Sequence, residues 1–321
     1  MDRRAFITLL TSTVGLATPT LADRKRPKIG LLDWFPPTMR VDLDHFREGM
    51  QQFGYVEGND YEIEVYFTSG DRQLTEETAR KLVREPVDVL VAVTSPAARV
   101  AAEATDTIPI VMLTASALAT DLSPSLSRPS RNLTGVSLLM TDVAGKRSGL
   151  LRQMNVHLKA VAFLGSTNDP YNAAFVRETK LAADNLGIAL SVRTIDGPSA
   201  LDQDVFDAMK RDGNEAVIVE PIFTGNQDKI VSMAMTAKLP VVADFSVFAD
   251  AGALMTYGPN QAASLRRAAY FVNRILKGAR PVDLPIEQPT AFELVINRRT
   301  AVQLGWTIPQ GVMVLADRVI E

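Results

Sequence analysis

The chain has 321 residues, 46% of them apolar and 22% charged, a globular composition with enough length for about two domains. Its net charge of −3 argues against a basic surface for nucleic acid or for an anionic membrane. The sequence contains no cysteine, which excludes disulfides, thiolate metal sites, cysteine nucleophiles and a lipid-modified N-terminal cysteine.

The first 22 residues have the pattern of a signal peptide. Two arginines give a positive start, residues 5–17 form a short apolar stretch, and small residues precede a cleavage site between Ala22 and Asp23. The apolar stretch is short for a membrane span, and an N-terminal membrane anchor is the alternative interpretation. We expect export by the Sec or the twin-arginine route, with the periplasm as the location of the mature protein.

The segments that follow predict an α/β lobe. Residues 28–32 form a first strand, and Trp34 lies in the loop at its carboxyl end. An exposed aromatic side chain there suits either stacking on a ligand or packing at the edge of the lobe. Apolar spacing then predicts a helix over residues 43–53, a strand over 61–67 and a helix over 74–83.

Residues 87–113 form the unit around which the rest of the chain is organised. An apolar run over 87–93, typical of a parallel strand buried on both faces, leads into Thr94, Ser95 and Pro96. Hydroxyls followed by proline are typical of a helix start. Because such helix starts attract anions, and ligands bind at the carboxyl ends of α/β sheets, this loop is a candidate carboxylate or phosphate site. An ordinary, well-capped βαβ connection is the alternative.

The same pattern recurs about 130 residues later, which indicates a domain-scale internal repeat. Residues 214–244 again read as strand, proline-bearing loop, helix, proline and strand, with Pro240 in the place of Pro109. The opening strands at 29–32 and 161–164 match in the same order. The predicted fold is therefore α/β, with two Rossmann-like lobes and a ligand cleft between them.

The second lobe is expected to begin with a helix over residues 144–154 and a strand over 159–164. Asp169 then reads as the N-cap of the next helix, with Pro170 at its first position. The later segments expected are a strand over 188–194, a helix over 201–211, a strand over 253–257, a helix over 261–276 and a helix over 293–304.

The last of these segments lie outside both repeats, so the chain must recross between lobes through more than one hinge strand. We assign residues 28–138 and 257–281 to the N-terminal lobe, and residues 139–256 and 282–321 to the C-terminal lobe.

The sequence carries little that resembles catalytic chemistry. His45 and His157 have no metal-ligand spacing, and the Gly-x-Ser-x-Gly, Walker and Gly-x-Gly-x-x-Gly motifs are absent. We therefore expect no catalysis, no metal and no cofactor. An isomerase or hydrolase that acts between two α/β lobes is an alternative hypothesis.

The predicted cleft loops carry groups suited to recognition: hydroxyls and backbone N–H groups for an anion, carboxylates for an ammonium group and aromatic rings for an apolar side chain. For the two carboxylates, solvated loop positions are the alternative. The candidate ligand-binding residues are Trp34, Thr94, Ser95, Thr114, Ser116, Ser166, Asn168, Glu220, Asp244 and Tyr257.

Several blocks of the sequence, taken together, resemble the family of ABC-transporter substrate-binding proteins that includes tryptophan- and tyrosine-binding members. They span nearly the whole chain, and the longest is the most specific. The blocks are RRAFITLL (3–10), FREGMQQFGYVEGND (46–60), TSPAARVAAEATDTIPIV (94–111), NLTGVS (132–137), GALMTYGPN (252–260), RILKGARPVDLPIEQPTAFELVINRRTAVQLG (274–305) and ADRVIE (316–321).

The resemblance implies a type I periplasmic-binding fold with three crossovers and no catalysis by this chain. It implies delivery of solute to a membrane permease driven by an ATPase, and places the family's Thr/Ser-Pro loop at Thr94, Ser95 and Pro96. We expect a monomer. Two positions differ from many relatives: Thr114-Ala115-Ser116 stands where Asp-Pro follows the strand, and Ser246 where a charged residue is common.

The expected function is capture of a small anionic or zwitterionic solute by lobe closure, with aromatic and aliphatic amino acids among the candidates. Presentation of the solute to a membrane receptor, as a sensor, is the alternative.

Overall fold

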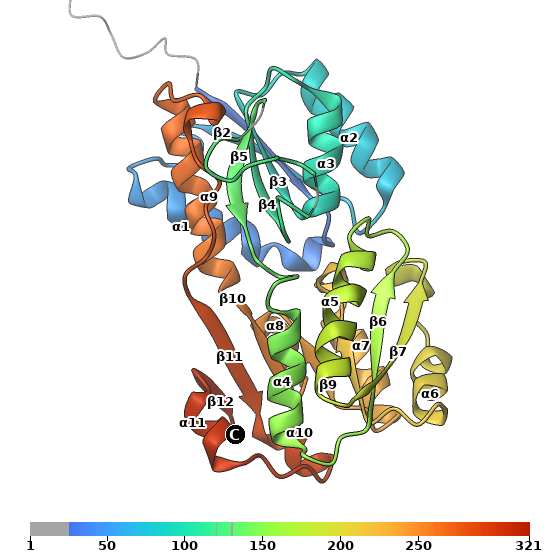
Figure 1. Ribbon diagram of the computed structural model, residues 1–321. Coiled ribbons are helices and arrows are strands. Elements are labelled where there is room, and N and C mark those ends of the chain that lie inside the picture. The colour runs from blue at the N-terminus through green and yellow to red at the C-terminus, as the bar shows by residue number, and fades with distance from the viewer. Residues whose placement is uncertain (1–25, 120, 130) are drawn as a thin grey trace, which may run out of the picture.

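The computed structural model describes residues 26–119, 121–129 and 131–321. The predicted signal peptide, residues 1–22, lies outside this part. The described chain folds into two α/β lobes, one above the other in Figure 1, with the C-terminus in the lower lobe. The predicted fold class is confirmed.

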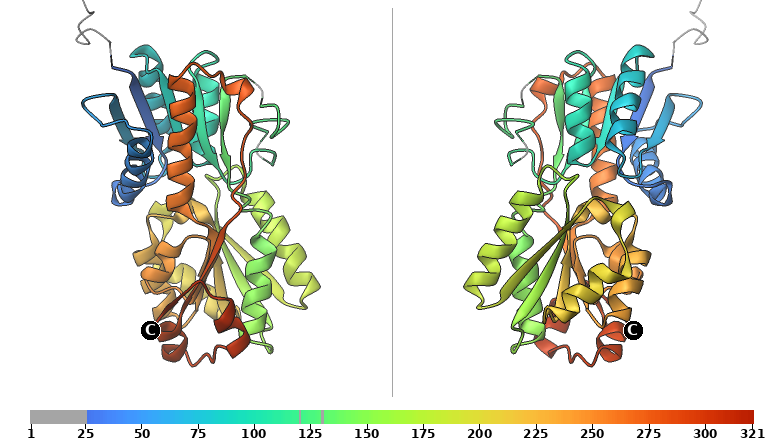
Figure 2. Two further views of the ribbon diagram at one scale, coloured as in Figure 1. Left: turned by 90° about the vertical axis from the view of Figure 1, so that its left-hand side faces the viewer. Right: turned by 90° about the vertical axis from the view of Figure 1, so that its right-hand side faces the viewer.

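The first lobe contains a five-stranded parallel sheet in the order β2-β1-β3-β4-β5. Its strands are β1 (Lys28–Asp33), β2 (Glu62–Phe67), β3 (Val89–Val93), β4 (Ile110–Thr114) and β5 (Leu133–Ser137). Helices pack on both faces, as a parallel sheet of apolar strands requires. On one face lie α1 (Val41–Gln52) and α9 (Gln261–Leu276), and on the other α2 (Arg72–Arg84) and α3 (Ser95–Ala104) (Figure 1, Figure 2).

The second lobe contains a seven-stranded sheet in the order β12-β11-β10-β9-β8-β6-β7, in which β10 and β11 are antiparallel. The strands are β6 (Ala160–Ser166), β7 (Ala189–Ile195), β8 (Ala216–Val219), β9 (Val241–Ala243), β10 (Met255–Pro259), β11 (Phe292–Asn297) and β12 (Arg318–Ile320). The helices are α4 (Ala144–Met154), α5 (Asn172–Asn185), α6 (Gln203–Arg211), α7 (Gln227–Thr236), α8 (Ser246–Asp250), α10 (Arg298–Gln303) and α11 (Gln310–Leu315). Short 3-10 turns are η2 (Pro37–Met39), η3 (Pro198–Ala200), η4 (Pro221–Phe223) and η5 (Pro281–Asp283).

The internal repeat is visible in the strand order. The order β7-β6-β8-β9-β10 in the second sheet reproduces β2-β1-β3-β4-β5 in the first. In this arrangement the ligand position of an open α/β sheet lies outside the carboxyl ends of its strands. Because the lobes face each other through those ends, both candidate positions open into the same space between the lobes.

The prediction of a helix over residues 293–304 is wrong for the first half of that segment. Residues Phe292–Asn297 form β11, which pairs with β10 on one side and β12 on the other, and only then does α10 begin. Val295 and Ile296 are β-branched residues that favour a strand once two partner strands are available. The next helix after β6 also begins later than predicted, at Asn172, so Asp169 is not its N-cap.

The chain passes between the lobes three times: after β5, after β10, and between η5 and β11 (Figure 2). Several crossovers were predicted, and this is confirmed. In the third passage Ser137 donates its backbone N–H to the carbonyl of Glu287 at 2.8 Å, so this segment pairs with β5. β10 stays in the second sheet as far as Pro259, so the second passage begins after that residue. The division of the chain predicted at residues 138, 256 and 281 stays a prediction.

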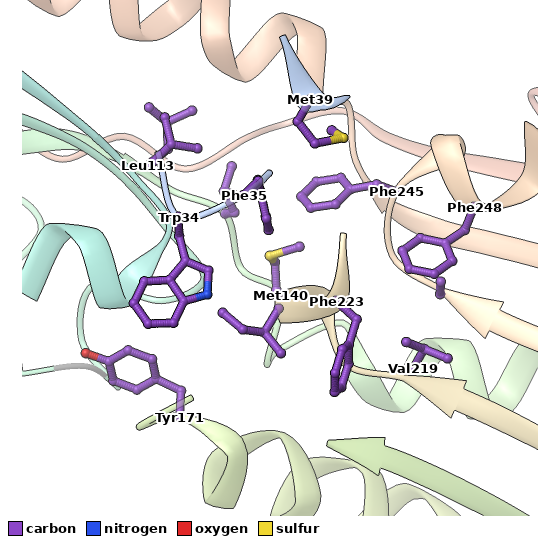
Figure 3. Close-up of a cluster of buried hydrophobic side chains, with 14 of the residues drawn as sticks. Trp34, Phe35, Met39, Leu113, Met140, Tyr171, Val219, Phe223, Phe245 and Phe248 are labelled. Atoms are coloured by element: carbon purple, nitrogen blue, oxygen red, sulfur yellow. The ribbon is translucent and has the colours of Figure 1, made fainter. Parts of the chain in front are cut away.

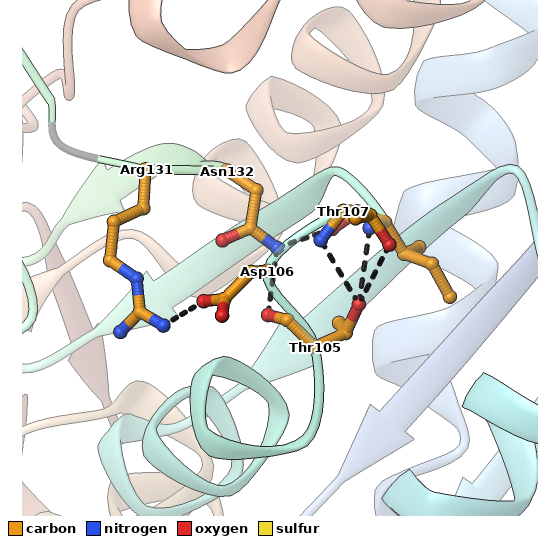
Figure 4. A network of polar contacts seen from close by, with 6 residues as sticks. Thr105, Asp106, Thr107, Arg131 and Asn132 are labelled. Atoms are coloured by element: carbon orange, nitrogen blue, oxygen red, sulfur yellow. Dashed lines mark hydrogen bonds and ion pairs between the residues drawn. The ribbon is translucent and has the colours of Figure 1, made fainter.

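A polar network lies before the amino ends of β4 and β5 in the first lobe (Figure 4). The amide Nδ2 of Asn132 donates to the backbone carbonyls of Thr105 at 3.1 Å and Ile108 at 2.6 Å. Beside it, Arg131 forms an ion pair with Asp106. Asn132 precedes β5, at the amino ends of the strands, so the block NLTGVS begins with a residue that ties the start of β5 to the loop before β4.

Helices α1 and α9 approach closely at Gly49. A Cβ atom at this position would lie 2.7 Å from the Cβ of Ala269 and 2.9 Å from backbone atoms of Arg266. Gly49→Ala is therefore expected to destabilise the fold by about 1–3 kcal/mol, although alanine is the better helix former. Gly149→Ala in α4, where nothing lies within 4 Å, is the matched control and is expected to stabilise the fold slightly. Denaturant unfolding of both variants measures the change in the free energy of unfolding, which is expected to be negative for Gly49→Ala and slightly positive for Gly149→Ala.

Candidate functional site

A cavity lies between the two lobes, where the carboxyl ends of the strands meet. The first lobe contributes the loops after β1, β3, β4 and β5 and the start of α9. The second lobe contributes the loops after β6, β8 and β9 and part of α5. The volume of the cavity is about 50 Å³, well below the roughly 150 Å³ of a cavity that holds benzene. A solute of amino-acid size therefore needs the lobes to separate further.

The walls of the cavity are mostly apolar. Phe35 and Leu265 come from the first lobe, and Phe175, Ile222 and Phe245 come from the second. Figure 3 shows that Phe35 and Phe245 lie near each other across the space between the lobes. Aromatic rings on both sides of a narrow space suit a flat, apolar group of a ligand.

Thr94 shapes the loop at the start of α3. It has a φ of 88°, a conformation that costs a β-branched residue on the order of 1–3 kcal/mol. Its side chain caps the helix by accepting a hydrogen bond from the N–H of Ala97 at 3.5 Å. Backbone strain of this kind is common at binding sites, and here it lies in a loop that lines the cavity.

Ser95 begins α3 and lines the same wall. Its Oγ lies 2.6 Å from Oγ1 of Thr114 and accepts a hydrogen bond from the N–H of Ala115 at 3.0 Å. The hydroxyl therefore ties the ends of β3 and β4 together. Within the described residues no backbone carbonyl accepts the N–H of Ser95. The anion site predicted at this helix start stays a prediction.

Asp169 lines the cavity from the second lobe, and the sequence did not identify it as a site residue. It is 7% exposed, and its Oδ1 accepts a hydrogen bond from the N–H of Tyr171 at 2.9 Å. Burial raises the pKa of Asp169 to about 6. The available signal was its place in the first loop of the second lobe, beside Ser166 and Asn168.

Two more polar side chains on the wall, Gln261 and Ser264, come from the first turn of α9. The hydroxyl of Ser264 donates to the carbonyl of Asn260 at 2.9 Å. Neither residue was singled out from the sequence, because each reads as an ordinary position in an amphipathic helix.

Glu220 lies behind the wall of the cavity. It is fully buried, and its carboxylate accepts hydrogen bonds from the N–H of Ser166 at 2.7 Å and from the amide of Asn172 at 3.2 Å. Burial raises the pKa of Glu220 well above its usual range, and the nearby charge of Asp169 raises it further. In this conformation Glu220 holds the loop that carries Asp169, and a direct contact with a ligand stays a prediction.

Asp244 forms a buried ion pair with Arg147 of α4. Burial raises the pKa of Asp244 to about 7, and the guanidinium group of Arg147 opposes that shift. Arg147 also donates to the backbone carbonyls of Tyr257 at 3.3 Å and Met140 at 3.5 Å. This one side chain thus joins the loop after β9 to the segments that lead into two of the three crossovers.

The remaining predicted residues lie around the cavity. Trp34 and Asn168 line a neighbouring crevice, in which Trp34 is 2% exposed, and Ser116 lines another. Thr114 contacts Ser95, as described above. The other two are engaged within the second lobe: Ser166 Oγ accepts from the N–H of Asn168 at 3.1 Å, and the ring of Tyr257 stacks on Phe292 with Lys146 over it at 4.7 Å.

Of the ten predicted positions, Thr94 and Ser95 therefore form part of the cavity wall in this conformation. Their contacts with a ligand, and those of the other eight, stay predictions. The chain described here contains no cluster of three histidine or acidic side chains arranged for a metal ion. Over the same residues, no helix combines the length and the apolar character needed to cross a membrane.

Comparison with known proteins places this architecture in a family. The family model described as ABC transporter substrate binding protein matches residues 36–320. The chain belongs to this family. Among curated members, the tyrosine-binding protein of Clostridioides difficile (strain R20291) is 22% identical over 279 residues, which cover 86% of this chain and 80% of that protein.

Solved structures agree with this substrate-binding fold. An ABC domain from Streptococcus pneumoniae in complex with L-Trp has a TM-score of 0.84 at 23% identity, covering 92% of this chain and 100% of that one. A conserved domain protein from Vibrio cholerae has a TM-score of 0.83 at 24% identity, with the same coverage. The leucine-binding protein LivK of Thermotoga maritima has a TM-score of 0.60 at 12% identity, covering 79% of this chain and 83% of that one. The fold is of the type I periplasmic-binding class.

Proposed function

We propose that this substrate-binding protein captures a zwitterionic α-amino acid with an aromatic or large apolar side chain and delivers it to an ABC importer. The observation that carries the proposal is that one cavity is lined by a helix start from the first lobe and by an acidic residue from the second lobe. The start of α3 in the first lobe suits a carboxylate, and Asp169 in the second lobe suits an ammonium group.

The middle of the cavity supports an apolar side chain. Phe35, Phe175 and Phe245 provide aromatic surface, and Ile222 and Leu265 provide aliphatic surface. Proteins similar to this chain include a relative described as tyrosine-binding and a protein of the same fold solved with L-Trp. These relatives support an aromatic amino acid as the first ligand to test.

Binding at both lobes explains how capture is coupled to closure. A ligand that contacts α3 on one side and Asp169 on the other binds the closed form more tightly than the open form. Shifting the equilibrium from 1:99 to 99:1 needs about 5.5 kcal/mol, within the roughly 8 kcal/mol of a micromolar complex. The permease and its ATPase partner would then recognise the closed shape, with the mature chain acting in the periplasm.

A thermal-shift screen of the chain from Asp23 onward tests the substrate class. The panel contains amino acids, small carboxylates, nucleosides and sugars. A ligand present at about 100 times its Kd adds about 2.7 kcal/mol of stability, which raises Tm by several degrees. Shifts confined to aromatic or large aliphatic amino acids support the proposal, and shifts with sugars or nucleosides alone contradict it.

The affinity for an amino acid is expected to fall at acid pH. The pKa of Asp169 is about 6 without ligand, and an ammonium group lowers it, so binding below that pH expels a proton. Affinity should therefore decrease about tenfold for each pH unit below about 6. Calorimetric titrations between about pH 7.5 and pH 5 measure this slope. A carboxylic acid without the ammonium group is the control ligand, and a flat profile for the amino acid would rule out an ionised Asp169 as its partner.

A further inference from the structure

The cavity has two ends that lie on opposite faces of the first sheet. Thr94 and Ser95 belong to the start of α3 on one face, and Gln261 belongs to the start of α9 on the other (Figure 1). A ligand whose carboxylate lies at α3 can extend its side chain across the cavity toward α9. The polar groups near the start of α9 would then determine which ligand side chains the cavity can bind.

The amide group of Gln261 is oriented by a buried carboxyl group. Its Nε2 donates to Oδ2 of Asp42 in α1 at 2.9 Å, and Asp42 is 2% exposed. An ionised carboxylate only accepts hydrogen bonds, so the nitrogen end of the amide is fixed toward α1. Within the described residues no donor reaches Oε1 of Gln261, which is left as an acceptor on a side chain that lines the cavity.

A second buried carboxyl group supports the same end of the cavity. Oδ1 of Asp33 accepts a hydrogen bond from the N–H of Phe35 at 2.9 Å, which anchors the loop that presents the Phe35 ring. Burial raises the pKa of Asp33 well above its usual range, and the charge of nearby Asp42 raises it further. One carboxyl group thus fixes an aromatic wall, and the other fixes an amide acceptor.

We propose that Gln261 determines specificity by accepting a hydrogen bond from the ligand's side chain, so that the site prefers an indole or phenol group over a phenyl or aliphatic group. This inference rests on the proposed function and adds the class of side chain. A ligand without a donor would leave a desolvated amide oxygen unpaired. Sites built to bind a donor discriminate strongly against analogues that lack it.

Two pairs of ligands isolate this hydrogen bond. L-tyrosine and L-phenylalanine differ by one hydroxyl group, and L-tryptophan and L-3-benzothienylalanine differ by replacement of the indole N–H with sulfur. Calorimetry is performed at about pH 8, because burial raises the pKa of Asp42 to about 7 and the carboxylate should be ionised. In the pair that binds more tightly, the donor-bearing ligand is expected to bind wild type at least about tenfold more tightly.

Gln261→Met keeps the length of the side chain and removes the acceptor. The preference for the donor-bearing ligand is expected to fall below about threefold, chiefly by weaker binding of that ligand. Gln73→Met is the matched control, because Gln73 also donates to a carboxylate, Glu77 at 2.9 Å, on the outer surface of α2. The control is expected to keep the full preference.

The outcomes separate this inference from the proposed function. Equal affinity of wild type for both members of each pair, or an undiminished preference in Gln261→Met, overturns the role of Gln261 while the amino-acid site stands. The wild-type comparison needs no variant, so it decides the matter even if the substitution impairs folding. Failure of wild type to bind any of the four ligands, or other α-amino acids, overturns the proposed function and this inference together.

Discussion

Asp169→Asn is expected to weaken binding of an α-amino acid by about 2–4 kcal/mol, which is 30-fold or more in Kd. The substitution keeps an oxygen for the N–H of Tyr171, now 2.9 Å from Oδ1, and replaces the other carboxylate oxygen with an uncharged NH2 group. An ammonium group buried in the closed cavity would then lack its counter-ion. The matching carboxylic acid without an ammonium group should lose no affinity, and calorimetry with both ligands measures the difference.

Stability distinguishes lost binding from lost folding. The pKa of Asp169 is raised from 3.8 to about 6, so the ionised group costs the folded state stability as the pH rises through that range. The ligand-free variant is therefore expected to be at least as stable as wild type at about pH 7.5. Asp202→Asn, which alters an exposed cap that accepts from Val205 at 3.0 Å, is the matched control. Equal losses for both ligand classes would remove Asp169 from the ammonium site.

Arg147→Met is expected to destabilise the protein by about 3–5 kcal/mol near pH 8, because it leaves the carboxyl group of Asp244 buried without a partner. It also removes the hydrogen bonds to Tyr257 and Met140 that join two crossover segments. The pKa of Asp244, already about 7, should rise further without the guanidinium group. The loss of stability of Arg147→Met relative to wild type should therefore become smaller toward pH 6, where Asp244 is protonated in both proteins.

Denaturant unfolding at about pH 6 and pH 8 tests this pH dependence. Arg152→Met in the same helix is the matched control. Arg152 donates to the carbonyl of Leu158 at 2.7 Å and has no carboxylate partner among the described residues, so a loss of about 1 kcal/mol is expected at both pH values. A deficit for Arg147→Met no larger than that of the control would show that the ion pair contributes little to the fold.

The two-lobe fold was predictable because its signals are local and occur twice. Apolar strands, a capped loop at Thr94 and a second copy in residues 214–244 predict the units, and the sheets show the same strand order in both lobes. The wrong prediction at residues 293–304 arose because the structure of this segment depends on contacts that are not local in sequence. Whether Val295 and Ile296 form a strand depends on β10 and β12, which lie far away in sequence or at the end of the chain.

The site was less predictable, because position after a strand does not say which way a side chain points. Glu220 and Asp244 follow buried strands as carboxylates in a cleft would, yet one holds a neighbouring loop and the other pairs with Arg147. Arg147 lies almost 100 positions before Asp244 in the chain, and nothing in the sequence of its helix indicates an ion pair with that residue. Asp169 and Gln261 reach the cavity only because loops and helices from both lobes converge there.

Calorimetric titration of the chain from Asp23 onward with L-tryptophan and L-tyrosine at about pH 7.5 tests the central claim most directly. We expect one binding site and, for at least one of the two ligands, a Kd of about 1 μM or below, equivalent to about −8 kcal/mol. The absence of binding by any α-amino acid up to about 1 mM, with a nucleoside or sugar binding instead, would contradict the assignment of Asp169 and the start of α3 as the two ends of an amino-acid site.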